Sequence, residues 1–174
     1  MILTAITVAT LILPALGFAD GFWRQKDVAA VDNPVYQEEC GACHFAYQPG
    51  LLPARSWEKV MAPKALESHF GDNAELENDV RMALANYLQK NSADKANYKR
   101  SRKIMASLRD RAPLRITDTP YIQRKHREIP NRMIQGNTQV KTLSACDACH
   151  KDAIKGMYDD DGVSVPGFGR WEDD

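Results

Sequence analysis

Two copies of a five-residue pattern, Cys-x-x-Cys-His, constrain this 174-residue chain more than any other feature. The copies read CGACH and CDACH, and they contain all four cysteines of the chain: Cys40 and Cys43 with His44, then Cys146 and Cys149 with His150. Two thiols three residues apart lie on one side of a helical turn, where both can form thioether bonds to the vinyl groups of one haem. The adjacent imidazole then lies below the iron as an axial ligand. The sequence therefore predicts two covalently bound haem c groups.

Three other uses of the cysteines fit this pattern less well. A zinc site takes four ligands, whereas two CxxCH motifs would offer six. A thioredoxin-like CGAC requires a βαβ context, and the sequence has no such pattern. A disulfide within one CxxC closes too short a loop to stabilise a fold much.

The two remaining histidines match the two iron positions that the motifs leave open. Besides the motif residues, the chain contains only His69 and His126. Each iron has one axial position left, so the simplest allocation gives both haems two histidine ligands. The spacing leaves open which spare histidine serves which haem. It also leaves open a methionine ligand, for which the sequence offers Met61, Met82, Met105 and Met133.

Residues 1–19 have the composition of a secretory signal peptide. The segment MILTAITVATLILPALGFA has no charged side chain, and its apolar run is followed by the small residues Gly17 and Ala19. This pattern predicts export with cleavage before Asp20. No Lys or Arg lies near Met1, so an uncleaved membrane anchor is the less favoured alternative.

The N-terminal part of the mature chain, residues 20–95, has the apolar spacing of helices. Residues 74–90 place their apolar side chains on one face, which predicts an amphipathic helix capped by Asp72 or Asn73. A shorter helix is expected after Ser56. The polar stretch NSADKANYKR that follows marks a domain boundary.

The C-terminal part, residues 96–174, holds the second motif and an acidic tail. Thr119 followed by Pro120 predicts a helix start, and His126 then lies on an apolar face of that helix. The second attachment helix is expected over residues 144–154, and the segment after it is expected to be loop. The predicted fold is thus mostly α, with two small helical haem domains. Their side chains alone would form thin cores, so buried porphyrins supply the apolar centres.

The charge distribution excludes a general affinity for nucleic acid. The chain carries 23 basic and 23 acidic side chains, with a formal net charge of zero. Residues 96–151 nevertheless hold 13 basic and 4 acidic side chains. This segment either neutralises acidic parts of the fold or forms a docking face for an acidic redox partner.

Several segments together resemble a bacterial family of diheme cytochromes c. They read CGACHFAYQPGLLPARSW, ESHFGDN, TPYIQRKHREIP and SACDACHKDA. The resemblance implies a periplasmic protein with a class I cytochrome c-like N-terminal domain and two bis-histidine haems. It also implies an acceptor, a small high-spin c-type haem protein that binds oxygen. Carried over by motif, the first haem takes Cys40, Cys43, His44 and His69, and the second takes Cys146, Cys149, His150 and His126.

The predicted function is electron transfer rather than catalysis. Iron with two imidazole ligands gains or loses an electron without changing its ligands, which leaves no position for a small-molecule substrate. Histidine in place of methionine also removes the ligand that raises the potential, so both haems are expected to have low potentials. The alternative is a haem enzyme or gas-binding sensor in which His69 or His126 does not bind iron.

Overall fold

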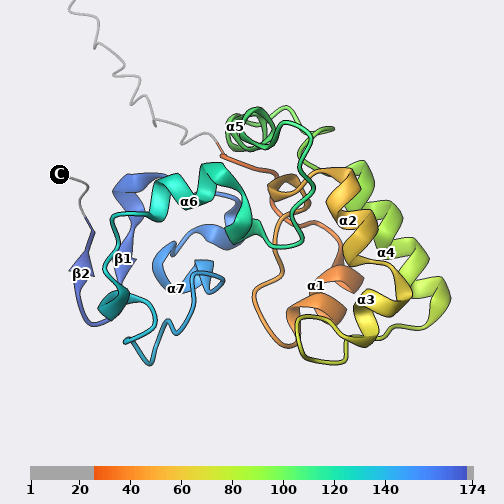
Figure 1. Cartoon of the computed structure of the whole chain (residues 1–174), viewed down its shortest axis with the longest axis horizontal. Helices are drawn as coiled ribbons and strands as arrows, with labels where there is room; N and C mark the ends of the chain where they lie inside the picture. The colour runs from red at the N-terminus through yellow and green to blue at the C-terminus, as the bar shows by residue number, and fades with distance from the viewer. Residues whose placement is uncertain (1–25, 172–174) are drawn as a thin grey trace, which may run out of the picture.

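The computed structural model describes residues 26–171, so the expected signal peptide lies outside the described residues. Figure 1 shows α1 to α4 on one side of the molecule and α6, α7 and the β1–β2 hairpin on the other, with α5 at the top of the view between them. The mostly α-helical fold predicted from the sequence is confirmed. Among residues 26–171, no helix is long and apolar enough to cross a membrane.

The helices are short and alternate with 3₁₀ turns, labelled η. In chain order the elements are α1 (Pro34–Gly41), η1 (Pro49–Leu51), α2 (Ala54–Val60), α3 (Pro63–Glu67), α4 (Asn78–Lys90), α5 (Lys99–Leu108), η2 (Ile116–Asp118), α6 (Pro120–His126), η3 (Asn131–Met133), α7 (Cys146–Cys149), η4 (Ala153–Lys155), η5 (Asp160–Gly162), β1 (Ser164–Val165) and β2 (Gly169–Arg170).

Helices α2 and α4 pack together in the N-terminal half. Trp57 on α2 and Leu84 and Leu88 on α4 are buried, and the indole N–H of Trp57 donates to the carbonyl of Pro49 at 2.8 Å. The short helix expected after Ser56 is therefore present, although it already begins at Ala54.

Helix α4 is shorter than the expected helix over residues 74–90. It begins at Asn78, and neither Asp72 nor Asn73 caps it. The side-chain oxygen of Asn73 accepts instead from the backbone N–H of Glu75 at 2.9 Å. This local Asx turn competes with helix formation, so the predicted cap is wrong.

The predicted start of α6 is confirmed. The hydroxyl of Thr119 accepts from the backbone N–H of Ile122 at 3.4 Å, and Pro120 occupies the first turn. Helix α6 ends at His126, whose carbonyl accepts a hydrogen bond from the backbone N–H of Ile129.

The second attachment helix is much shorter than the predicted residues 144–154. Helix α7 ends at Cys149, because His150 has φ −92° and ψ 89°, outside the helical region. His150 instead forms a β-bridge with Val163, and the following segment contains the two-residue strands β1 and β2, which pair antiparallel. The prediction of a loop there missed this small hairpin.

One core joins the two halves of the described chain. Buried residues from both halves form a single cluster, which includes Val28, Leu51, Ile104, Leu108 and Tyr158. Backbone N–H groups of residues 27 and 28 both donate to the carbonyl of Gly156. Gly156 has φ +78°, and a Cβ there would lie 2.3 Å from the carbonyl oxygen of Val28, so this junction requires glycine. The division into domains at residues 20–95 and 96–174 stays a prediction.

Truncation of Ile104 tests the core at this junction. Ile104 lies on α5, which packs against α6 and η1, and it is 0% exposed, so Ile104→Ala should destabilise the haem-loaded protein by about 2–4 kcal/mol. Chemical unfolding followed by circular dichroism measures the change. Leu114→Ala is the control, because Leu114 is 44% exposed, and its cost should stay within about 0.5 kcal/mol. Equal costs for both substitutions would contradict this account.

Candidate functional site

The structure brings the four histidines together in two pairs. The ring centroids of His44 and His69 lie 6.2 Å apart with an interplanar angle of 22°. Those of His126 and His150 lie 6.1 Å apart at 72°. Each pair joins a motif histidine to one of the two spare histidines.

These separations match the space that one metal atom occupies between two imidazoles. A nitrogen ligand lies about 2 Å from its metal. Ring bonds of about 1.3–1.4 Å place each ring nitrogen about 1.1 Å from the ring centroid. Two imidazoles on opposite sides of one metal therefore have centroids about 6.3 Å apart, close to both observed values.

The first pair is formed by the end of α1 and by a tight turn. Cys40 lies on α1, and Cys43 and His44 follow directly after it. His69 opens a turn in which its N–H donates to the carbonyl of Asp72 at 2.7 Å and its carbonyl accepts from the N–H of Asp72 at 3.2 Å. Phe70 within the turn has φ +56°, which is unusual for a bulky residue. The two hydrogen bonds with Asp72 thus fix the backbone of His69.

The turn that carries His69 also contacts the C-terminal half. The guanidinium of Arg115 lies 3.9 Å from the ring centroid of Phe70, and the Phe70 ring lies 4.7 Å from that of His69. Burial, with smaller effects of His44 and Arg115, lowers the pKa of His69. His69 is therefore neutral at pH 7, the form in which imidazole binds metals.

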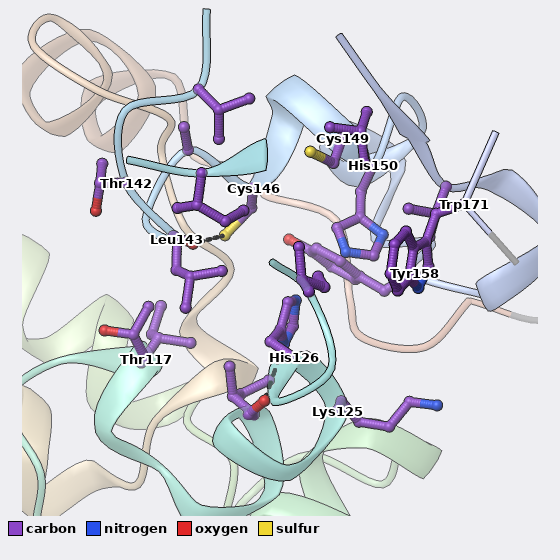
Figure 2. Close-up of a pocket in the computed structure, with 18 of the residues that line it drawn as sticks. Thr117, Lys125, His126, Thr142, Leu143, Cys146, Cys149, His150, Tyr158 and Trp171 are labelled. Carbon is purple, nitrogen blue, oxygen red and sulfur yellow. Dashed lines mark hydrogen bonds between the residues drawn. The ribbon is translucent and has the colours of Figure 1, made fainter. Parts of the chain in front are cut away.

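The second pair faces an apolar cavity, shown in Figure 2. His126 enters it from α6 and His150 from the end of α7, with Tyr158 beside His150. Many of the lining side chains are aliphatic, among them Leu51, Ile116, Ile122, Ile129, Ile134, Val140, Leu143, Val163 and Val165. Such a lining suits the apolar body of a porphyrin. Arg100 and Lys125 also line the cavity and are its two basic side chains besides the histidines.

A backbone hydrogen bond orients His126. Its Nδ1 lies 2.8 Å from the carbonyl of Ile122, one helical turn earlier, which leaves Nε2 to bind a metal. Burial lowers the pKa of His126 and, together with His126 and Arg100 nearby, lowers that of His150 to about 4. Both rings are therefore neutral at pH 7.

His150 is held in a different way. Its Nδ1 is buried and makes no hydrogen bond with any residue in the described part of the chain. The ring of Tyr158 lies 5.3 Å from that of His150 at 63°, an edge contact. Packing rather than a hydrogen bond therefore sets the orientation of this ring.

No disulfide joins the four motif cysteines, so all four are available for thioether bonds. Burial raises the pKa of Cys40 to about 11 and that of Cys146 to about 12, so both thiols are uncharged at pH 7. A thioether is uncharged too, so attachment of haem places no charge in these apolar surroundings. The cysteines and the paired imidazoles fit two haem groups, and the apolar lining around the second pair suits a porphyrin there.

This combination of sites defines a c-type cytochrome with two haem attachment motifs. A family model described as "Dihaem cytochrome c" matches residues 36–158, and the chain belongs to this family. It carries two covalently bound haem c groups, as predicted from the sequence.

Solved structures agree with the family model. The chain is similar to the diheme cytochrome type c of Shewanella baltica OS155, with 41% identity, a TM-score of 0.67, and coverage of 80% of this chain and 98% of that chain. For the diheme cytochrome c of Rhodobacter sphaeroides the identity is 36%, the TM-score 0.65, and the coverage 75% and 100%. Curated proteins gave no match.

The motif spacing alone did not indicate the residues that surround the histidines. Tyr47 and Gln48 follow CGACH by only three and four residues, and this short spacing could have suggested that they lie near a haem. Arg100 and Tyr158 gave no such signal. Arg100 lies 46 residues before the second motif, and Tyr158 is in a segment predicted to be an irregular loop.

Proposed function

We propose that the protein is a periplasmic electron carrier with two low-potential haems, each bound by two histidines. The observation that carries the proposal is the pairing of His44 with His69 and of His126 with His150 at 6.2 and 6.1 Å. This pairing supports the allocation in which His69 serves the first haem and His126 the second. Membership of the diheme family is consistent with electron transfer.

The residues around each iron position keep both ligands in place. The backbone turn at residues 69–72 fixes His69, and the carbonyl of Ile122 fixes His126. When bound, each haem supplies an iron that accepts or releases one electron. With both imidazoles of a pair as its ligands, that iron would offer no position to a substrate, which supports a carrier rather than an enzyme. Imidazole in place of a thioether favours a low potential.

Export to the periplasm is supported by residues 1–19, whose apolar run and small residues suit a cleaved signal peptide.

The proposed acceptor is a small high-spin c-type haem protein, as the family resemblance implies. Docking is supported by exposed cations on α5, among them Lys99, Arg102 and Lys103. In the described part of the chain these three form no ion pair, so their charge is available to an acidic partner.

The ring angles predict two different low-spin spectra. Nearly parallel imidazole planes, as at 22° for His44 and His69, donate into one iron d orbital and separate it in energy from its partner orbital. Nearly perpendicular planes, as at 72° for His126 and His150, act on both orbitals alike. Electron paramagnetic resonance of the ferric protein should therefore show one rhombic signal and one signal of larger anisotropy. Two identical signals, or a high-spin signal at rest, would count against the proposed ligands.

Removal of a spare histidine should open one iron position. His69→Ala and His126→Ala should each convert one haem to high spin and allow carbon monoxide to bind that haem rapidly after reduction. The wild-type protein should bind carbon monoxide slowly or not at all. Each substitution should remove a different low-spin signal, the rhombic one for His69→Ala. Rapid binding by the wild type would favour the gas-sensor or enzyme alternative.

Charge reversal on α5 tests the docking surface. Lys99→Glu with Lys103→Glu should slow electron delivery to a purified high-spin c-type haem protein at low salt, and the effect should shrink at about 1 M salt, where the Debye length is about 3 Å. Lys59→Glu with Lys90→Glu is the matched control, since it changes the charge equally on α2 and α4. An equal effect of both pairs, or an effect that salt does not reduce, would exclude electrostatic docking on α5.

A further inference from the structure

The loop after the first haem motif forms hydrogen bonds to residues on both sides of the second motif. Tyr47, three residues after His44, donates its hydroxyl to the carbonyl of Ser144 at 2.8 Å, just before CDACH. Gln48 donates its side-chain amide to the carbonyl of Ala153 at 2.6 Å, just after CDACH. The segment that leaves the first site therefore holds the second attachment turn at its start and at its end.

Gln48 makes a second contact that reaches the histidine of CDACH. Its side-chain oxygen accepts from the hydroxyl of Tyr158 at 2.5 Å. Gln48 is 0% exposed and Tyr158 is 6% exposed. Burial raises the pKa of Tyr158, so the hydroxyl keeps its proton and remains a donor. Hydrogen bonds in such surroundings are costly to break, because each abandoned polar group stays buried.

Tyr158 is fixed at three points, and its ring lies against His150. Its backbone N–H donates to the carboxylate of Asp27 at 2.8 Å, and its carbonyl accepts from Arg100 at 2.7 Å. The bond to Gln48 fixes the far end of the side chain. His150 has no hydrogen bond at Nδ1 within the described residues, so the edge of the Tyr158 ring is the contact best placed to set its orientation.

We propose that Gln48, acting through Tyr158, positions the His150 imidazole, so that a residue in the loop of the first haem sets the ligand geometry of the second. Gln48 and Tyr158 are positioning residues, because neither lies at an iron position. The inference rests on the proposed function in taking His150 as an iron ligand. Since metal-bound imidazoles are tuned by the groups that orient them, the effect should appear at the second haem alone.

Two substitutions in the haem-loaded protein test the proposal. Tyr158→Phe keeps the ring and removes the hydroxyl, and Gln48→Leu keeps the approximate volume and removes both bonds. Each should shift the electron paramagnetic resonance signal and the midpoint potential of the second haem, while those of the first haem stay unchanged. The double variant should shift them no further than Gln48→Leu alone, because both changes break the same bond. His126→Ala identifies which signal belongs to the second haem.

Ser101→Ala is the matched control. Ser101 is 0% exposed, and its hydroxyl donates to the carbonyl of Gly50 at 2.8 Å, a bond that also joins the two halves. Neither Ser101 nor Gly50 lines the cavity of His126 and His150. It should lower the unfolding temperature and leave both signals unchanged.

Three results separate the outcomes. If Tyr158→Phe folds with both haems and leaves the second signal unchanged, the inference is wrong. An equal shift from Ser101→Ala would also overturn it, since a general loosening would then explain the data. If Gln48→Leu does not yield haem-loaded protein, Tyr158→Phe decides alone. If the proposed function itself is wrong, the wild-type protein will lack a low-spin second haem, so the two failures can be told apart.

Discussion

Holding two imidazole rings about 6 Å apart, the spacing that one metal atom between them requires, is the constraint on which the rest of this structure depends. The ring separations of 6.2 and 6.1 Å are achieved between residues 25 and 24 positions apart in the chain. Each site therefore needs one rigid element for the motif histidine and another for its partner. A backbone turn supplies the second element for His69, and the capped helix α6 supplies it for His126.

The two sites are connected by contacts that cross from one half of the chain to the other. Tyr47 and Gln48 reach the second motif, and Arg115 reaches back to Phe70 beside His69. Arg100 adds a buried connection, since it lies 3.2 Å from the carboxylate of Asp27 and also donates to the carbonyl of Tyr158. The surroundings of one histidine pair are thus not structurally independent of those of the other.

The distribution of charge follows from the same arrangement. Arg100 is only 11% exposed and pairs with Asp27, because a buried cation without a partner would be costly. Other cations of the same segment, such as Arg102 and Lys103, are exposed. The basic segment is thus partly neutralised inside the fold, by Asp27 at Arg100 and Asp160 at Lys125, and partly exposed on α5, where the proposed docking face lies.

By itself the sequence determined the two attachment sites, the number of imidazoles and the mostly helical class. These depend on local spacing, since both thioether bonds and the adjacent ligand come from five consecutive residues. Prediction of helix ends from the sequence is less exact, because local backbone conformations compete with the helix. The turn at Asn73 shortens α4, and the bend at His150 ends α7.

Only the tertiary structure decided which imidazoles face each other and what surrounds them. Loop spacing does not determine that His69 meets His44 rather than His150, because the distance between rings depends on how separate turns pack. Gln48 and Tyr158 lie 110 residues apart, and their hydrogen bond exists only because the core brings the two haem loops together.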